Sequence, residues 1–364
     1  MTLPDTMRAI VLVGHGGLDK LEYHTDWPRP EPGPDQVLIK VEACGMNNTD
    51  VNTRVGWYSK AVSDATSGDG FEEVGEDDPT WGGAPISFPR IQGADVVGEI
   101  VAVGANVDAN RIGQRIMTDN WLRDWSDPLN KYSTGYFGSE ADGGYAEYTV
   151  IDHRNAHVVQ SDMTSAELAT FSCSYSTAEG MLTRANVGAD DVVLITGASG
   201  GVGSALIQLA KRRGAKVVAM ASENKHAQLA ELAPDALLPR SVPNLGKALK
   251  AAIGRETVTV VADIVGGPAF GSLIDVIARG GYYTCSGAIA GPMVELDLRT
   301  FYLNDLTFTG STVIPPQIFE NLVSYIERGE VKPLVAQTVP LADFQAGQAA
   351  FIEKSHIGNF VVVP

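Results

Sequence analysis

Three polar side chains lie close together in the chain: Asn47, Asp50 and Tyr58. The amide of Asn47 can donate to a carbonyl oxygen or a ribose hydroxyl, and the Asp50 carboxylate can orient that amide or a ribose hydroxyl. A phenol has an unperturbed pKa of about 10, so Tyr58 can act as an acid at neutral pH. Structural roles stay open: Asn47 as a strand-end cap, Asp50 as a helix-start residue and Tyr58 as a packing aromatic.

A glycine-rich segment provides a second kind of chemistry. The apolar run Val192–Thr196 leads into the glycine-rich turn 197–203, and a helical stretch follows at Ser204–Lys211. Strand, turn and helix in this order predict a loop that holds the pyrophosphate of a dinucleotide. The residues expected in contact with it are Ser199, Gly200, Gly201, Val202 and Gly203. Ala198 replaces the first glycine of the usual fingerprint, so a tight turn without a ligand is the alternative.

The end of the next strand favours NADPH over NADH. The run Lys216–Ala221 ends at Ser222, where NAD sites carry an acidic residue that binds the ribose hydroxyls. A serine can donate to a 2′-phosphate, and Lys225 and Arg240 supply cations that can pair with it. Glu223, one residue late, could turn inward and select NADH instead.

The elements that must position these residues form two patterns. From about Asp190, strand-like and helical stretches alternate, which predicts a parallel sheet with helices on both faces. Shorter strand-like runs separated by Gly and Pro, from Met7 to about Val150, predict a β-rich, partly barrel-like domain. We therefore expect an α/β protein in which a nucleotide domain, residues 158–305, is inserted between residues 1–157 and 306–364 of a catalytic domain.

The segment from Lys60 to Pro89 interrupts this rhythm. It is polar and glycine-rich, which predicts a surface loop, and the alternatives are a lid or a subunit contact near the active site. Its seven acidic residues are Asp64, Asp69, Glu72, Glu73, Glu76, Asp77 and Asp78.

Composition excludes several classes of protein. The 364 residues have a net charge of −17 and no cluster of Lys and Arg, which argues against binding nucleic acid or an anionic membrane. No apolar run approaches the ~20 residues of a membrane span, and no secretory signal is visible at the N-terminus. Three widely spaced cysteines indicate a reducing compartment, so we expect a cytoplasmic protein.

Several motifs together resemble the medium-chain dehydrogenase/reductase superfamily, and within it the zinc-free quinone oxidoreductase (zeta-crystallin) branch. This resemblance implies a GroES-like β-rich catalytic domain, a Rossmann domain with a doubly wound parallel sheet, an active site in the cleft between them, and a homodimer. The motifs are Ala43-Cys44-Gly45-Met46-Asn47-x-x-Asp50, the stretch from Gly93 to Gly104, Gly144-Tyr145-Ala146-Glu147-Tyr148, Ser176-Thr177-Ala178 and the turn 198–203.

The resemblance also implies roles for single residues. Thr177 matches a threonine that lies against the nicotinamide, and Tyr58 matches a tyrosine that related enoyl reductases use as a proton donor. Further positions match loops or a cation near the cofactor: Gly266, Ser286, Gly287, Ala288, Gly310, Ser311, Thr312 and Lys354.

Zinc alcohol dehydrogenases carry metal ligands at positions where this chain has Asn47 and Ala94. Cys173 and Asp95 match further positions of that site, but a catalytic zinc needs three protein ligands. The stretch from Gly104 to Gly144 holds no cysteine for a second, structural zinc. We therefore expect no metal, with Cys173 as a buried small residue or a reactive thiol near the nicotinamide.

Without a Lewis acid, simple alcohol oxidation is difficult, whereas an activated C=C bond or a quinone accepts hydride more readily. The sequence thus predicts an NADPH-dependent reductase of quinones, enones or enoyl thioesters. Two alternatives remain: an alcohol or aldehyde dehydrogenase of the zinc type, and an NADPH-binding structural or regulatory protein with little catalysis. Trp57, Trp121 and Trp125 are candidates for lining an apolar pocket, and equally for ordinary core positions.

Overall fold

The computed structural model describes residues 3–72, 74–75, 77–78 and 83–364. Glu73 and Glu76 of the acidic segment therefore lie outside the described residues. The chain divides into two compact units, each described here by itself. Unit 1 comprises the described residues through Val62, with Ser67–Cys173 and Pro315–Pro364, and unit 2 comprises Ser63–Thr66 and Ser174–Ile314.

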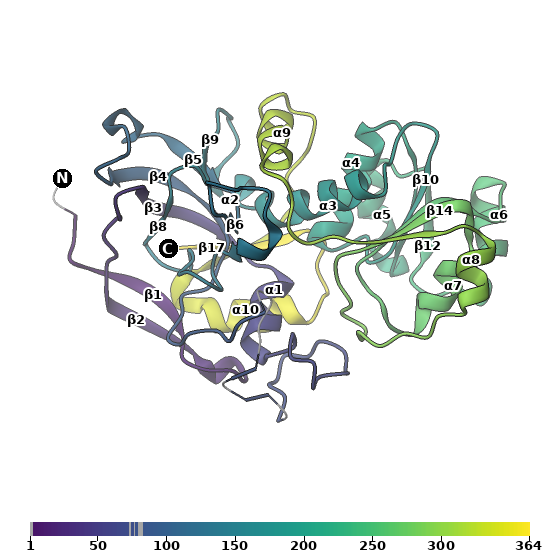
Figure 1. Ribbon diagram of the computed structural model, residues 1–364, viewed down its shortest axis with the longest axis horizontal. Helices are drawn as coiled ribbons and strands as arrows, with labels where there is room; N and C mark the ends of the chain where they lie inside the picture. Colours follow the sequence, from purple (N-terminus) through teal and green to yellow (C-terminus); the bar gives the residue numbers. More distant parts are fainter. Residues whose placement is uncertain (1–2, 73, 76, 79–82) are drawn as a thin grey trace. The chain divides into compact units, whose positions relative to one another are not determined.

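A seven-stranded sheet organises unit 1, with the order β16-β17-β3-β4-β5-β9 and β8 paired to β3 (Figure 1). All its pairings are antiparallel except β16 with β17. Val37, Ile39 and Val41, which alternate along the long and mostly buried β3, belong to a core that includes Tyr145 and Phe344. The strands are β3 (Gln36–Gly45), β4 (Asp95–Val103), β5 (Arg115–Thr118), β8 (Tyr148–Asp152), β9 (Ala156–Val158), β16 (Val335–Pro340) and β17 (Asn359–Val363).

Smaller elements surround this sheet. Two hairpins accompany it: β1 (Thr6–Leu12) with β2 (Leu21–Pro28), and β6 (Trp121–Leu122) with β7 (Gly135–Tyr136). The helices of unit 1 are α1 (Asn48–Val55), α2 (Ser165–Leu168), α9 (Pro316–Glu327) and α10 (Phe344–Ile352). The described part of residues 60–89 forms no helix or strand, in agreement with the surface loop that its composition predicts.

Unit 2 is built on a six-stranded parallel sheet with the order β12-β11-β10-β13-β14-β15. This is the 3-2-1-4-5-6 order of the Rossmann fold, so the predicted doubly wound α/β domain is confirmed. The strands are β10 (Val192–Ile195), β11 (Lys216–Ala221), β12 (Ala236–Pro239), β13 (Val258–Asp263), β14 (Ile277–Cys285) and β15 (Thr307–Gly310).

Helices cover this sheet (Figure 1). Helix α4 packs on β10 and β11, α6 packs on β12, and α7 packs on β14. The helices are α3 (Ser172–Arg184), α4 (Gly201–Arg212), α5 (His226–Leu229), α6 (Leu245–Ile253), α7 (Phe270–Asp275) and α8 (Leu298–Leu303).

The unit boundaries fall after Cys173 and Ile314, not after the expected residues 157 and 305. At the first boundary, Arg115 on β5 donates to the carbonyl oxygens of Ser161 and Met163, so the chain stays with unit 1 beyond residue 157. At the second, β15 adds a sixth strand to the parallel sheet, and residues up to Ile314 remain with it. No helix among the described residues is long and apolar enough to span a membrane.

Candidate active site

Helix α1 starts at a buried capping arrangement. Asn47 is its N-cap, and the backbone N–H of Asn47 donates to Asp50 Oδ2 at 2.8 Å. The hydroxyl of Tyr145 donates to the same oxygen at 2.6 Å. Burial raises the pKa of Asp50 to about 6, and these two hydrogen bonds oppose the rise. Asp50 therefore starts the helix and also fixes the main chain of Asn47.

The side chain of Asn47 is left with unused hydrogen-bonding capacity. Asn47 is 7% exposed, and its Nδ2 makes no hydrogen bond of ordinary length among the described residues, although the side chain interacts weakly with the Asp95 carboxylate. Asp95 is fully buried: its Oδ1 accepts from the backbone N–H of Cys173 and from Asn120 Nδ2, both at 3.0 Å. Burial raises the Asp95 pKa to about 7, and hydrogen bonds from the Asn47 side chain, the Cys173 backbone and Asn120 oppose the rise. Asp95 Oδ2 makes no hydrogen bond of ordinary length within the described part of the chain, so a bound molecule could compete for Asn47 and for this oxygen.

Tyr58 lies in the turn after α1, beyond the C-cap Gly56. Its hydroxyl donates to Thr49 Oγ1 at 3.1 Å. Burial raises the pKa of Tyr58, and the nearby Cys173 and Asp50 add to that rise. The phenol is therefore neutral near pH 7 and belongs to the same polar neighbourhood as Asp50.

The residues of this cluster do not fit a zinc ion. The amide of Asn47 and the methyl group of Ala94 occupy two of the family's ligand positions, and neither supplies an imidazole or a thiolate. Asp95 Oδ1 already accepts two N–H groups. Within the described ranges, no group of three His, Cys, Asp or Glu side chains has an arrangement that could hold a metal.

The hairpin β6–β7 contributes two residues that the sequence analysis did not single out. Asn120, just before β6, donates from Nδ2 to Asp95 and also to the hydroxyl of Tyr136 at 3.3 Å. Tyr136 is buried, and its hydroxyl forms a hydrogen bond with the Cys173 side chain. A buried ion pair at 2.8 Å between Arg123 and Asp119 braces this hairpin. It lies in the stretch where a structural zinc would have required cysteines.

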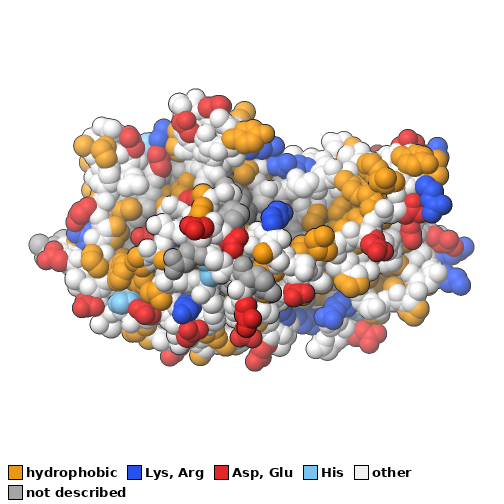
Figure 2. All heavy atoms as spheres, turned by 60° about the horizontal axis from the view of Figure 1, so that its bottom comes forward, with side chains coloured by type: hydrophobic (Ala, Val, Ile, Leu, Met, Phe, Trp, Pro, Cys, Tyr) orange, Lys and Arg blue, Asp and Glu red, His pale blue; other side chains and the backbone are white. Residues whose placement is uncertain are grey.

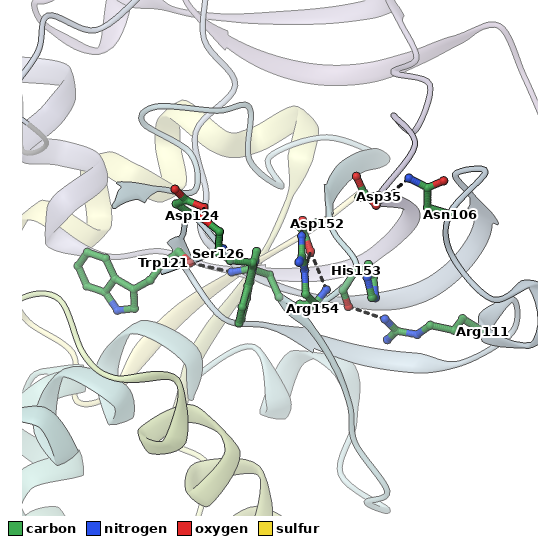
Figure 3. A network of polar contacts seen from close by, with 11 residues as sticks. Asp35, Asn106, Arg111, Trp121, Asp124, Ser126, Asp152, His153 and Arg154 are labelled. Carbon is green, nitrogen blue, oxygen red and sulfur yellow. Dashed lines mark hydrogen bonds and ion pairs between the residues drawn. The ribbon is translucent and has the colours of Figure 1, made fainter. Parts of the chain in front are cut away.

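The three candidate tryptophans each pack against neighbouring side chains of unit 1. Trp121 is buried with its ring edge-on to that of Tyr136, 5.0 Å between centroids. The guanidinium of Arg154 lies 5.1 Å from the ring centre of Trp125, and Arg154 also pairs with Asp152 (Figure 3). Trp57 packs against the apolar core of unit 1. Trp125 therefore lies against two charged groups, Arg123 and Arg154.

In unit 2, the glycine-rich turn connects β10 to α4. Gly197 has a backbone φ of 57°, which residues other than glycine rarely adopt. A Cβ on Gly203 would approach the carbonyl oxygen of Gly197 to 2.2 Å, so this glycine allows helix and turn to pack closely. A Cβ on Gly200 would meet no atom nearer than 3.7 Å. The space over Gly200 is therefore open, as a pyrophosphate-binding turn requires.

Basic side chains gather at the ends of β11 and β12. Lys225 Nζ donates to Ser199 Oγ at 3.3 Å. Partial burial lowers the pKa of Lys225, and the positive charge of Arg240 adds to this, so the two cations lie near each other. Ser222 is the N-cap of the turn that contains Lys225, whereas the side chain of Glu223 is exposed. The residues present fit a phosphate group beside the ribose.

The other expected cofactor residues follow the carboxyl ends of β13, β14 and β15, where ligands bind in this fold. The Asp263 carboxylate accepts from the backbone N–H groups of Val265 and Gly266, which fixes the loop after β13. Gly266 has φ 62°, and a Cβ there would lie 3.0 Å from Ala288 Cβ. Ser286 Oγ donates to the carbonyl oxygen of Ser311 at 2.6 Å. Gly287, Gly310 and Thr312 also lie at or just after the carboxyl ends of β14 and β15.

Helix α3 carries both Cys173 and Thr177. They are four residues apart, so they share one face of the helix. A Cβ on Gly180, one turn further, would lie 3.1 Å from Ser311 Oγ, which places the segment after β15 against this helix. Lys354 lies elsewhere, in unit 1, where its Nζ donates to Asn48 Oδ1 at 2.6 Å.

Comparison with known proteins agrees with this architecture. The "Alcohol dehydrogenase GroES-like domain" family matches residues 33–161, and the "Zinc-binding dehydrogenase" family matches residues 201–328. A crystal structure from Sinorhizobium meliloti, provisionally assigned as an alcohol dehydrogenase, is 47% identical, with a TM-score of 0.90 over 100% of this chain and 98% of that one.

Two curated relatives cover nearly the whole chain. Acryloyl-coenzyme A reductase from Sulfurisphaera tokodaii is 26% identical over 98% of this chain and 100% of its own length. Quinone oxidoreductase from Pongo abelii is 27% identical over 92% of this chain and 91% of its own. A Rossmann unit combined with a GroES-like unit defines a class of nicotinamide-dependent oxidoreductases. The chain belongs to the medium-chain dehydrogenase/reductase superfamily.

Proposed function

We propose that this protein is an NADPH-dependent, zinc-independent reductase of quinones or activated C=C bonds in enones or enoyl thioesters. The observation that carries the proposal is the chemistry of the Asn47 site. It offers buried hydrogen-bond donors and acceptors, and the described residues offer no set of three metal ligands. Such a site favours an acceptor that is already electrophilic.

The residues of unit 2 support NADPH as the reductant. The turn from Ser199 to Gly203 would hold the pyrophosphate, and Lys225, Arg240 and Ser222 would hold the 2′-phosphate. Thr177 would contact the nicotinamide, and the loops at Gly266, Ser286–Ala288 and Gly310–Thr312 would border the cofactor. Lys354 stays a weaker candidate, because its ammonium already contacts Asn48 and the Phe351 ring.

When bound, the reduced nicotinamide supplies a hydride. The residues of the chain orient the acceptor and stabilise the charge that develops on its oxygen. Asn47 Nδ2 donates to that oxygen, because its interaction with Asp95 is weak and leaves the N–H able to turn to a ligand. Asp50 holds the main chain at Asn47 in place. Tyr58 then gives a proton to the reduced substrate and is reprotonated from water.

An alcohol dehydrogenase activity is the second candidate. The 47% identical Sinorhizobium meliloti protein carries that provisional assignment, and one matching family is described as zinc-binding. The donor set at Asn47, Ala94 and Cys173 argues against it, since too few side chains there can hold zinc. A purely structural NADPH-binding protein remains the third candidate.

A screen of NADPH oxidation under pre-steady-state conditions tests the proposal. Acceptors should include 1,2- and 1,4-quinones, small enones and enoyl thioesters, with alcohols plus NADP as the opposing set and metal analysis of the same sample. Rapid reduction of a quinone or C=C acceptor by metal-free protein is the expected result. Alcohol turnover with stoichiometric zinc would establish the second candidate, and tight NADPH binding without turnover the third.

We also propose a cytoplasmic homodimer. Apolar side chains are exposed between β14 and β15 of unit 2, and a partner subunit would cover them. They are Met293, Val294, Leu298, Tyr302 and Leu303. On the face drawn in Figure 2, acidic and basic side chains are interspersed among the described residues, and no broad basic patch is visible. This agrees with the proposal that the protein has no nucleic-acid partner. Light scattering with wild type and Leu298→Glu tests the dimer; two monomeric proteins would contradict it.

A further inference from the structure

A closed ring of buried polar contacts connects the hairpin β6–β7 to the start of α3. Asn120 Nδ2 donates to Asp95 Oδ1 and to the hydroxyl of Tyr136. That hydroxyl forms a hydrogen bond with the side chain of Cys173, whose backbone N–H returns to Asp95 Oδ1. The four residues are far apart in the sequence, and the fold of unit 1 brings them together.

The hairpin fixes the position of Tyr136 within this ring. Its aromatic ring packs edge-on against Trp121. The backbone N–H of Trp121 donates to the Asp119 carboxylate. The carbonyl oxygen of Trp121 accepts from Arg123 and Asn155. Tyr136 is 6% exposed, so its hydroxyl is held by its neighbours and not by bulk water. A hydroxyl fixed in this way is preorganised to donate in one direction.

Buried atoms around the ring are poorly satisfied. Asn120 Oδ1 has no hydrogen-bond partner among the described residues, and Asn47 Nδ2 and Asp95 Oδ2 make no hydrogen bond of ordinary length there, only the weak one between the Asn47 and Asp95 side chains. Several poorly satisfied buried polar atoms at one place indicate a polar group that occupies the site during function. Cys173, a member of the ring, lies one helical turn before Thr177 on α3.

We propose that Tyr136 is a further catalytic residue, whose hydroxyl donates a hydrogen bond to the substrate carbonyl oxygen that becomes negative during reduction. This inference rests on the proposed function and assigns one more donor to the same site. The hydroxyl turns from the Cys173 sulfur, a weak acceptor, to the substrate oxygen. The Asn47 amide turns from its weak interaction with Asp95 and is the second donor to that oxygen.

The electron and proton balance assigns different roles to the two phenols. Hydride adds to the electron-poor carbon, the C=C electron pair moves toward the carbonyl oxygen, and an enolate forms. The enolate then takes a proton from Tyr58, and the neutral product leaves. Tyr136 keeps its proton throughout, because burial and the neighbouring Cys173 and Asp95 raise its pKa well above the ordinary value.

The test compares Tyr136→Phe with wild type and with Tyr132→Phe, an exposed tyrosine in the connection between the two hairpin strands. We expect kcat for the best enone to fall on the order of 10²-fold in Tyr136→Phe, as for the loss of one oxyanion donor. NADPH affinity should match wild type, and the melting temperature should fall only slightly, because the lost contacts are one long hydrogen bond and one to a thiol. The loss should be smaller for a quinone, whose reduced oxygen is less basic and depends less on the donor.

A fluorinated tyrosine at position 136 covers the case in which the phenylalanine variant does not fold. It keeps the ring and the hydroxyl but makes that hydroxyl a stronger hydrogen-bond donor, so enone kcat should rise above that of wild type. Unchanged enone kcat in Tyr136→Phe, or unchanged enone kcat with fluorotyrosine, overturns the inference while the proposed function stands. Wild-type protein that reduces no quinone, enone or enoyl thioester overturns the proposed function, and the inference with it.

Discussion

The hydroxyl of Tyr145 donates a buried hydrogen bond of 2.6 Å to Asp50 Oδ2, although the two residues are 95 positions apart in the sequence. The same hydroxyl contacts the carbonyl oxygen of Gly45, at the end of β3, at 3.2 Å. One phenol thus joins the last residue of a strand to the first turn of α1. The orientation of Asn47 depends on a residue that belongs to neither element.

Removing this hydroxyl should weaken the fold. We expect Tyr145→Phe to lower the free energy of unfolding by about 1–3 kcal/mol, because Asp50 loses a donor while remaining buried. Urea unfolding followed by tryptophan fluorescence measures the change. The exposed Tyr132→Phe is the matched control and should unfold like wild type. Equal midpoints for all three proteins would show that the contact contributes nothing to stability.

The ionisation of Asp50 should make the free energy of unfolding depend on pH. Its pKa is raised from 3.8 to about 6 in the folded chain, so the folded state binds this proton more tightly than the unfolded state. The stability from this group is present below about pH 4 and is lost as the pH rises through about 6. Asp95 and Asp119, with pKa values raised to about 7 and about 6, act in the same sense.

We therefore expect Asp50→Asn to flatten the decline of the unfolding free energy between pH 4 and pH 6, by an amount on the order of 1–3 kcal/mol. Denaturant unfolding at half-unit pH steps measures the slope. Glu231→Gln, at an exposed position, should keep the wild-type slope. A slope in Asp50→Asn equal to that of wild type would contradict the assigned sign.

Replacement by Ala should affect two glycines of the cofactor turn differently: at Gly203 it should lower stability, and at Gly200 it should weaken NADPH binding. Gly203→Ala pushes a methyl group against the Gly197 carbonyl oxygen, so we expect about 1–3 kcal/mol less stability, as for an overpacked core. Gly200→Ala meets no such obstacle and should unfold like wild type. Its methyl would instead fill space meant for the pyrophosphate and weaken NADPH binding about tenfold or more. Thermal melts with and without NADPH separate the two effects.

Cofactor choice should depend on Lys225. Lys225→Met removes a cation proposed to pair with the 2′-phosphate, so NADPH affinity should drop about 10-fold while NADH affinity changes little. Lys216→Met, at the opposite end of β11, is the control. Fluorescence titration with both cofactors gives the ratio. An equal loss for NADPH and NADH would place Lys225 on the shared part of the cofactor.

The sequence predicts the parallel sheet well because its strands are continuous apolar runs. The run Lys216–Ala221 matches β11 in full, and Val192–Thr196 extends one residue beyond β10. Turn chemistry likewise locates the glycine loop before α4. These features are local, since each depends on residues within a few positions of one another.

The polar ring could not be predicted in this way. Asn120 meets Asp95 across 25 residues and Tyr136 across 16, through a short hairpin whose strands have two residues each. Tyr145 belongs to a recognised motif, yet its partner becomes visible only when β3 and α1 are folded together. A single tyrosine gives no local sign of which buried carboxylate or thiol it will meet.

The loop after β13 has a thermodynamic consequence. Asp263 also accepts from Tyr283, so its carboxylate holds the backbone of that loop from the strand beneath, with no ligand involved. A loop already ordered in the empty protein gives up little freedom when a dinucleotide arrives. In calorimetry, replacing Asp263 with Ala should therefore appear as a larger unfavourable entropy of association, even if the contacts finally formed are the same.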